Sequence, residues 1–276
     1  MIAPAAQARA VTRIAAADPN VSRVSPRQLS RDGRIALVSV VPRSDPAAPA
    51  TGATIDRLRR ELPAGAKVGG TAAENHDLES VLASTTPIAV GFVLILGFLL
   101  LLVALQAPLL AFLGVVSNLL AVGAAFGIAK WIFQDGALHT LLGFQSQGFL
   151  DAWGPIFFFA MIFAISMDYT LFLLSSAKEH WDRTGDAQEA MIGGLAHSGR
   201  VIFAAGGVMV AVFFTFALSG PLPPKEMGVI LGIAVLLDAA FIRLLLVPAI
   251  LAITGRAAWW LPQPLARILP NIRFGH

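Results

Sequence analysis

The stretch that decides the fold reads Gly-Pro-Ile-Phe-Phe-Phe-Ala-Met-Ile-Phe-Ala-Ile-Ser-Met-Asp-Tyr-Thr-Leu-Phe-Leu-Leu, from Gly154 to Leu174. Apart from Asp168 it carries no charge, and its length suits the roughly 30 Å hydrocarbon core of a bilayer. A carboxylate within such a run costs about 2.5 to 3.5 kcal/mol on insertion scales, so it is tolerated where it faces a protein interior or a water path. Asp168 is therefore a candidate proton or ion site.

The composition of the whole chain is that of a membrane protein. Of 276 residues, 56% are hydrophobic and 13% charged, with a mean hydropathy of +0.73, whereas a soluble domain carries about 25% charged residues. The absence of cysteine excludes disulfides and thiol catalysis. The histidines share no metal-ligand spacing, so we expect no metal site and no cofactor. The basic residues are mixed with acidic ones and lack aromatic neighbours, so no nucleic-acid partner is expected.

Residues 1–84 have the patterns of a soluble α+β domain. Its elements come in the order αββαβ, which corresponds to a ferredoxin-like unit that lacks its first strand. We expect this domain to be extracytoplasmic, and because no apolar signal segment precedes it, an upstream span is needed to carry it across. The predicted helices lie near residues 4–17 and 54–62, the predicted strands near 21–25, 35–41 and 67–70, and a last helix near 74–82 leaves the domain.

Residues 85–254 predict a polytopic bundle of five membrane helices. The last span exceeds one straight crossing, so we expect it to tilt or to kink at Pro248. Because five is an odd number, the two ends of the bundle lie on opposite sides. The spans are placed at Pro87–Leu105, Pro108–Phe133, Gly154–Ser176, Val201–Leu218 and Met227–Ile253.

The lysines and arginines of the short loops predict the orientation. The two other loops of the bundle offer only Lys225, so the basic segments 177–199 and 255–276 are placed in the cytoplasm and residues 1–84 outside. The first segment is predicted to be an amphipathic helix on the inner surface, broken at Thr184-Gly185-Asp186, with Asp186 capping the helix after the break. The basic residues of these segments and their flanks are Lys178, Arg183, Arg200, Arg256, Arg267 and Arg273.

The last span contains two further charges, Asp238 and Arg243. Five residues correspond to about 140° of net rotation on an α-helix, so the two are predicted to lie on different faces and to pair with other helices. We assign Asp238 a coupling role. Arg243 either shares that role or snorkels to the interface. Asn118, in the second span, is interpreted as interhelical hydrogen-bonding glue.

Tyr169 is the only tyrosine of the chain and directly follows Asp168. The two side chains are about 100° apart on a helix, so they are expected to point to different neighbours. Asp168 serves either as a titrating proton carrier or as a structural carboxylate neutralised by a basic partner.

Several segments, taken together, are similar to one family of transporters. They are Phe163–Tyr169, Thr184–Asp186, Gly194–Ile202, Leu236–Ala249, Trp259–Pro262 and, before the first span, Gly69–Ala72. The chain resembles the mycobacterial-membrane-protein-large (MMPL) branch of the resistance-nodulation-division (RND) superfamily over nearly its whole length.

The resemblance implies a proton-motive-force-driven exporter of lipids or other hydrophobic molecules, with twelve spans in two repeats. It implies that Asp168 and Tyr169 form a proton relay on the tenth span, facing a similar pair on the fourth. Asp238 and Arg243 would be coupling charges of the twelfth span, and Gly70 a sensitive glycine of the second porter domain. The five spans would be the eighth to the twelfth, so we expect a C-terminal part that needs a complementary N-terminal half or self-association.

The alternative is a non-transporting membrane module that binds lipid or scaffolds a partner. The residues of the expected relay and coupling sites have the chemical types that transport needs, and this favours the transporter. They are Asp168, Tyr169, Asp238 and Arg243. No nucleophile, base and orienting group form a recognisable constellation, so an enzyme is not expected.

Overall fold

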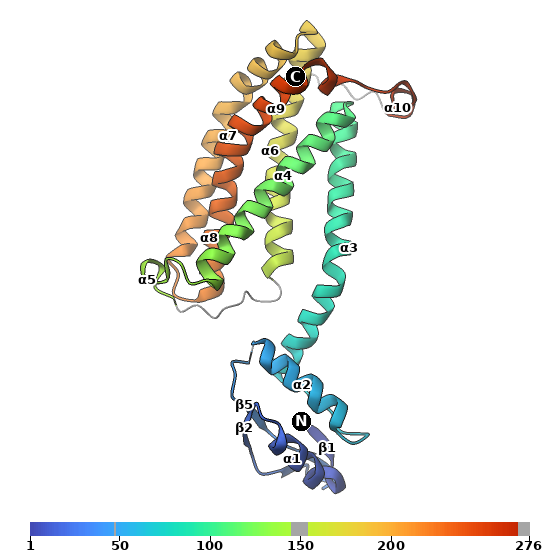
Figure 1. Cartoon of the computed structure of the whole chain (residues 1–276), viewed down its shortest axis with the longest axis vertical. Coiled ribbons are helices and arrows are strands. Elements are labelled where there is room, and N and C mark those ends of the chain that lie inside the picture. Colours follow the sequence, from blue (N-terminus) through green and yellow to red (C-terminus); the bar gives the residue numbers. More distant parts are fainter. Residues whose placement is uncertain (47, 145–153, 270–276) are drawn as a thin grey trace. The chain divides into compact units, whose positions relative to one another are not determined.

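The computed structural model describes residues 1–46, 48–144 and 154–269 (Figure 1). The chain divides into two compact units, the first ending at Thr85 and the second beginning at Thr86. Arg273, one of the basic residues predicted for the tail, lies outside the described residues.

The N-terminal unit contains short strands and two helices around a small core. Helix α1 (Ala8–Ala17) buries one face through Ala8, Val11 and Ala15, spaced three and four residues apart as an amphipathic helix requires. The strands form two antiparallel sheets, of order β1-β4-β3 and β2-β5. The other elements are β1 (Ile2–Pro4), β2 (Val21–Val24), β3 (Gln28–Leu29), β4 (Ile35–Leu37), β5 (Val40–Pro42) and α2 (Pro49–Glu61).

These sheets correct the predicted ferredoxin-like order. A strand, β1, precedes the first helix, and three residues are too few for an alternating pattern to reveal it. The predicted strand 35–41 is two strands, because the chain changes sheets at Val38 and Ser39: Val38 N–H bonds Met1 O, whereas Ser39 O accepts from Ser25 N–H. The predicted strand 67–70 is reduced to a single bridge between Ile2 and Lys67.

The second unit is a bundle built on helices long and apolar enough to cross a membrane, and the described residues contain the predicted number, five. The first two are α3 (Thr71–Leu105), which starts in the N-terminal unit, and α4 (Pro108–Ala129), extended by the π-helical turn η2 (Lys130–Gln134). The next two are α6 (Gly154–Thr184) and α7 (Ala187–Ala217). The fifth is composite: α8 (Leu222–Leu237), the π-helix η3 (Asp238–Leu246) and α9 (Val247–Thr254).

Three short helices complete the second unit. They are α5 (His139–Leu142), the 3₁₀ turn η4 (Gly255–Trp259) and α10 (Gln263–Ile268). Trp259 of η4 stacks on Trp181 of α6 with ring centroids 5.2 Å apart. This aromatic pair fixes the end of the last span against α6.

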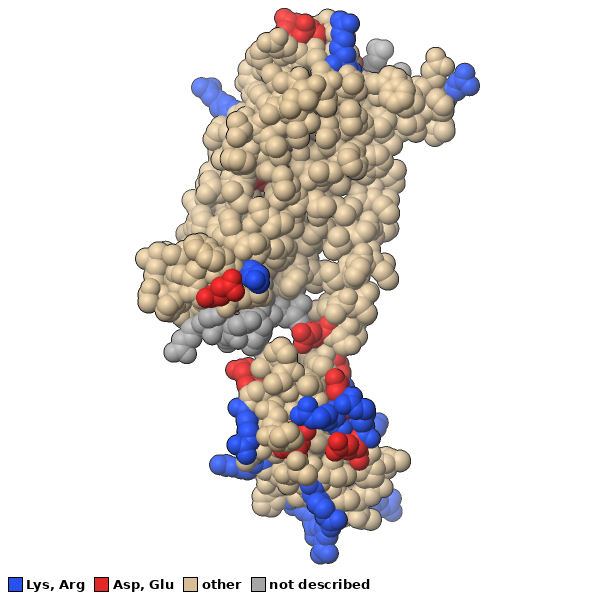
Figure 2. All heavy atoms as spheres, in the orientation of Figure 1, with Lys and Arg blue, Asp and Glu red and all other residues tan. Residues whose placement is uncertain are grey.

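Helices α6, α7 and α8 pack side by side, and α4 crosses α6 and α8 (Figure 1). Small residues allow the closest approaches: a Cβ on Gly228 of α8 would lie 2.5 Å from the carbonyl oxygen of Phe213 on α7. Such small-residue contacts are a main source of helix association in membranes. Figure 2 shows that the sides of the bundle carry almost no charged side chains in this view, whereas the N-terminal unit carries many.

The predicted surface helix over residues 177–199 is part of two longer helices in the structure. Its residues belong to α6 and α7, which continue without interruption up to a break at Gly185 and Asp186. Gly185 adopts a positive φ of 66° that suits glycine, and Asp186 Oδ1 accepts from the backbone N–H groups of Gln188 (2.7 Å) and Glu189 (3.0 Å). The predicted N-cap at Asp186 is thus confirmed. Good helix formers on both sides of the break lengthen the two spans instead of forming a separate element.

Candidate functional site

Asp238 and Arg243 form an ion pair inside the bundle. Arg243 Nη2 lies 2.7 Å and Nε 2.9 Å from Asp238 Oδ2, and the two residues, Arg243 and Asp238, are only 1% and 2% exposed. The prediction that they lie on different faces is wrong, because η3 is a π-helix. Its hydrogen bonds run between residues five apart, which brings the fifth residue round to the same face.

The π-helix η3 ends two residues before Pro248, where a kink was expected. Pro248 lies in the first turn of α9, directly after η3 ends at Leu246. Proline has no N–H to donate to the preceding turn, so the regular α-helical bonding cannot run unbroken through this part of the span. The π-helical irregularity therefore places Asp238 and Arg243 together.

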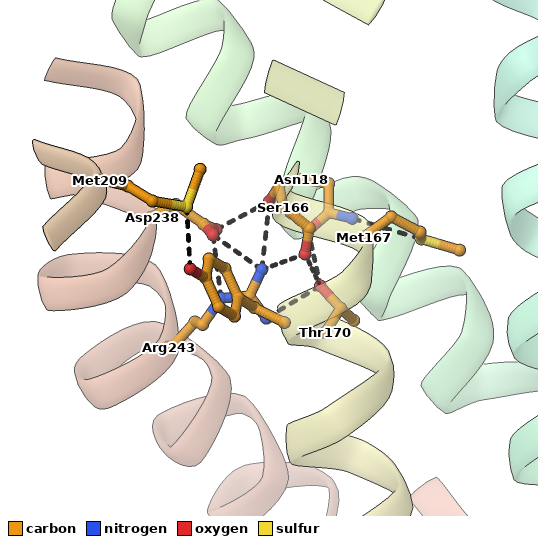
Figure 3. A network of polar contacts seen from close by, with 8 residues as sticks. Asn118, Ser166, Met167, Thr170, Met209, Asp238 and Arg243 are labelled. Carbon is orange, nitrogen blue, oxygen red and sulfur yellow. Dashed lines mark hydrogen bonds and ion pairs between the residues drawn. The ribbon is translucent and has the colours of Figure 1, made fainter. Parts of the chain in front are cut away.

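Helix α6 supplies the polar partners of this ion pair (Figure 3). Ser166 Oγ lies 2.8 Å from Asp238 Oδ1, and Arg243 Nη1 donates to Thr170 Oγ1 at 3.0 Å. Arg243 Nη2 also donates to the backbone carbonyl of Ser166. All three guanidinium nitrogens are thus engaged, as burial of a charge requires.

Asn118 of α4 closes the network on its other side. It is fully buried, and its Oδ1 lies 2.9 Å from Ser166 Oγ and 2.8 Å from Thr170 Oγ1. This confirms Asn118 as an interhelical hydrogen-bonding residue. The single hydroxyl hydrogen of Ser166 can go to Asn118 or to Asp238 but not to both at once. The network therefore links α4, α6 and η3, and the Ser166 hydroxyl can donate to one of two acceptors in it.

Ser166 and Thr170 were not recognised as site residues from the sequence. A signal was present, because they are four residues apart and so lie on one face of a helix, and both are polar within an otherwise apolar run. Two hydroxyl residues so placed can line a buried polar site, but their partners become visible only when the helices are packed.

Tyr169 lies at the edge of the network. The guanidinium carbon of Arg243 is 5.5 Å from the centre of its ring, within cation–π distance, and its hydroxyl lies 3.1 Å from Met209 Sδ on α7. Tyr169 is partly buried, so it joins the ion pair to the neighbouring helix. The predicted relay pair is therefore divided, because only Tyr169 contacts the ion pair.

Asp168 lies on the other side of α6. At about 100° per residue it is about 160 to 200° round the helix from Ser166 and Thr170, so it cannot join the network. Its side chain is exposed from the bundle and lines a groove of about 310 Å³ between α6 and α7. The other lining residues are Leu171, Phe172, Ser175, Ser176, Glu179 and His197.

Gly70, the predicted porter-domain residue, lies in the N-terminal unit just before α3. Its φ is +100°, a conformation that residues other than glycine adopt with strain, and its carbonyl oxygen accepts from the N–H groups of Ala73 and Glu74. No other atom lies within 4 Å of the position a Cβ would take. A substitution at Gly70 would therefore be strained by backbone geometry at the start of α3, not by crowding. Among the described residues, no cluster of three or more potential ligands could hold a metal.

The model of the MMPL family matches residues 3–270. The chain belongs to the MMPL family.

Three relatives within the family are named for uptake or export. The chain is 40% identical over 95% of its length to the heme uptake protein MmpL11 of Mycobacterium tuberculosis. It is 38% identical over 93% of its length to the mycolic acid-containing lipids exporter MmpL11 of Mycolicibacterium smegmatis, and 31% identical over 75% of its length to the trehalose monomycolate exporter MmpL3 of M. tuberculosis. The chain spans only 27%, 27% and 22% of the length of these relatives, respectively.

Proposed function

We propose that this chain is the C-terminal part of a proton-motive-force-driven exporter of lipids or other hydrophobic molecules. One observation supports this most: α6 carries an exposed carboxylate, Asp168, on one face, and its opposite face contacts the buried ion pair of η3 through Ser166 and Thr170. Ionisable groups inside membrane spans are costly and are found mainly at ion pathways and proton relays.

In this proposal Asp168 is the group that takes up and releases the proton. It lies deep in a span of apolar sequence, yet it is not held by any ion pair within 4 Å among the described residues. A carboxylate without a fixed counter-charge is free to change its charge state. Tyr169 is the second member of the relay, because its ring faces Arg243 while its backbone is joined to Asp168.

Asp238 and Arg243 act as coupling charges. They hold Ser166, two residues before Asp168, through both its side chain and its carbonyl oxygen. A displacement of α6 that follows protonation of Asp168 must therefore either move η3 with it or change the Ser166 hydrogen bond. The alternative acceptor on Asn118, 2.9 Å from Ser166 Oγ, offers such a second arrangement.

The cargo is proposed to be a lipid or another hydrophobic molecule. Two relatives are named as exporters of mycolic acid-containing lipids and of trehalose monomycolate, and another is named for heme uptake. Lipids and heme both combine a large apolar body with polar groups. The shared feature supports a carrier of amphipathic molecules rather than of small ions.

For the orientation we propose that residues 1–84 face the extracytoplasmic side and the tail from Gly255 the cytoplasm. The basic residues near the Gly185 break and η4 support this through the positive-inside rule. A reporter that is active only in the cytoplasm should be silent when inserted near Asp45 and active when inserted after Trp260. The reverse pattern would overturn the orientation.

Transport by this proposal requires a complementary half or self-association. Alternating access in repeat transporters needs one repeat to rock against another, with the ion site at their interface. The exposure of Asp168 on the side of the five-helix bundle supports a site completed by another element. The chain alone should therefore insert into membranes without moving protons or cargo.

The experiment that tests the proposed function measures export and proton flux together. Membranes that contain the complete transporter should couple lipid export to an imposed proton gradient, and Asp168→Asn should abolish both while the protein remains inserted. The chain alone, reconstituted into liposomes with an internal pH-sensitive dye, should give no proton flux above that of empty liposomes. Export that persists in Asp168→Asn would reject the relay, and flux from the chain alone that vanishes in Asp168→Asn would reject the need for a second half.

A further inference from the structure

Another groove of the bundle lies between the start of α4 and η4, the turn that follows the last span. We call it the α4–η4 groove. Its volume is about 760 Å³, in the range of ligand pockets, and it is open to the surroundings. Five of its six lining residues are apolar or aromatic, and the sixth is a cation. They are Pro108, Leu109, Phe112, Ala257, Trp260 and Arg256. Such a lining suits a molecule with a long apolar part and a negatively charged group.

Tryptophans place the α4–η4 groove at the level of the membrane surface. Trp259 of η4 stacks on Trp181, which lies five residues beyond Ser176, the predicted end of the span on α6. Tryptophan is enriched at this level, and Trp260, which lines the groove, is 67% exposed. Phe112, on the opposite wall, lies about 6 Å along α4 from the start of that helix. A molecule in the groove therefore has one end among the lipid headgroups and the other beside the hydrocarbon.

Arg256 supplies the positive charge of the groove. It is exposed, and it forms no ion pair within 4 Å among the described residues. Asp186 interacts electrostatically with Arg256 from a longer distance, but its Oδ1 accepts the backbone N–H groups of Gln188 and Glu189. The guanidinium is therefore available to a further anion, and arginine binds phosphate through two parallel N–H···O bonds.

The chemistry of the lining distinguishes between possible occupants. A zwitterionic phospholipid carries an amine or trimethylammonium group as well as a phosphate, and the lining residues include no carboxylate to pair with it. A free phosphate ion would pair with Arg256 but would leave the apolar wall uncovered, including Phe112, which is 56% exposed. A phospholipid with a net negative charge matches both the cation and the apolar wall, and basic residues at the membrane surface attract such lipids.

We propose that the α4–η4 groove binds an anionic phospholipid of the surrounding membrane. Its phosphate contacts Arg256, and an acyl chain lies along Leu109 and Phe112 beside Trp260. The lipid is a bound component of the bundle and not the cargo, so the proposal does not rest on the proposed function. Because the lipid contacts α4 and η4 together, it stabilises the packing of the end of the last span on α4.

Trp260 provides the fluorescent signal for the test. The full chain is reconstituted into vesicles of phosphatidylglycerol, which is anionic, and phosphatidylcholine, which is zwitterionic, and one of the two lipids carries bromine on its acyl chains. Bromine quenches a tryptophan that it contacts, and the variant Trp260→Phe gives the signal of the other tryptophans, which is subtracted. Varying the proportion of the two lipids gives their relative binding constant at Trp260. We expect phosphatidylglycerol to bind about fivefold more tightly, the ratio that one arginine supplies at the membrane surface.

Three variants and one competitor identify the source of the preference. Arg256→Gln removes the charge of an exposed side chain and should bring the relative binding constant to about one, whereas Arg256→Lys keeps the charge and should keep most of the preference. Arg267→Gln is the matched control, because it removes an exposed arginine of α10 that does not line the groove. Inorganic phosphate on both sides of the membrane should leave the preference unchanged, since it cannot cover the apolar wall.

Three results would overturn the proposal. Equal binding of the two lipids by the wild type would show adventitious lipid contact only. A preference that persists in Arg256→Gln would assign the anionic lipid to another part of the bundle. Loss of the preference on addition of inorganic phosphate would make free phosphate the occupant. Failure of the proposed function would leave the expected result unchanged, because the quenching measures lipid contact and not proton-coupled transport.

Discussion

Asp238 and Asp168 are two carboxylates at membrane depth in one bundle, and their surroundings are opposite. Asp238 is 2% exposed and is bonded to Arg243 and Ser166, whereas Asp168 is exposed and lies in a groove with Ser176, Glu179 and His197. An opposite charge and hydrogen bonds hold Asp238 in place inside the bundle, whereas no ion pair within 4 Å holds Asp168 among the described residues. The comparison teaches that position in an apolar span does not by itself assign a function to a carboxylate.

The two regions are nevertheless mechanically joined through α6. Asp168 and Ser166 are two residues apart on the same helix, and Ser166 is held by both members of the ion pair. In the proposed function, the charge changes at Asp168, and the network around Asp238 and Arg243 sets the helix positions. Substitutions made separately in the two regions should distinguish these roles.

The largest effect is expected from Asp168→Asn in the complete transporter. Asparagine keeps the size of the side chain but cannot titrate, so proton-dependent export should fall to the level of an empty membrane, with normal abundance and insertion. The readout is export under an imposed proton gradient. Asp182→Asn is the matched control, because Asp182 lies on the same helix at its exposed end and should leave export intact. Export by Asp168→Asn at half the normal rate or more would remove Asp168 from the relay.

The next effect is a loss of stability when the ion pair is broken. Removing one member of a buried pair typically costs about 3 to 5 kcal/mol because the other charge stays buried without a partner. Arg243→Met should therefore lower the thermal stability of the purified full chain strongly. The double variant Asp238→Leu with Arg243→Met removes both charges and should recover most of the loss while leaving export uncoupled. A double variant as unstable as the single one would show that the network, not charge balance, sets stability.

A smaller effect is expected from Tyr169→Phe. Loss of the hydroxyl contact to Met209 should cost only about 1 kcal/mol of stability, because the ring volume is kept. Export should nonetheless fall toward the level of Asp168→Asn, since the relay loses its hydroxyl. The measurement compares export at matched membrane abundance. Full export by Tyr169→Phe would show that the Tyr169 hydroxyl has no part in the relay and that the ring only packs against Arg243.

The smallest effect concerns an ion pair outside the membrane. Arg57 donates to both carboxylate oxygens of Asp18 at 2.9 and 3.0 Å, and this hydrogen bonding holds the pKa of Asp18 below its ordinary value. A lowered folded-state pKa stabilises the N-terminal unit above the unfolded value of about 3.9, and this contribution is lost as the pH falls through the folded-state pKa.

The measurement for this pair is hydrogen–deuterium exchange of the amides of α1 and β2 in the full chain across that acid range. Asp18→Asn should lose some protection at neutral pH and show a weaker dependence on acid than the wild type. An identical acid dependence in both proteins would assign the acid response of this unit to other carboxylates.

Much of the fold could be predicted from the sequence because it depends on local composition. Runs of apolar residues give the five spans, and a glycine followed by aspartate gives the break and cap at Gly185 and Asp186. The divergence of Asp168 and Tyr169 follows from the rotation of a helix and needs no knowledge of the neighbouring helices.

The pairing of Asp238 with Arg243 could not be predicted in the same way. The apolar pattern of the last span suits an α-helix and a π-helix equally, and the choice between them is a matter of hydrogen-bond register. The network around Ser166 and Asn118 depends on how α4 and α6 pack, and the sheet switch at Val38 depends on partners more than ten residues away. These are tertiary properties that a local pattern does not contain.

The most direct test of the central claim is an infrared titration of the carboxyl groups in the reconstituted full chain. Spectra of the wild type, of Asp168→Asn and of the double variant Asp238→Leu with Arg243→Met are recorded over the same pH range. The carboxyl band of the wild type should grow on acidification. We predict that the part of this growth that comes from Asp168 is missing in Asp168→Asn and present in the double variant. A contribution that persists in Asp168→Asn and disappears in the double variant would show that the buried carboxylate is the one that titrates, and would contradict the division of roles between the two regions.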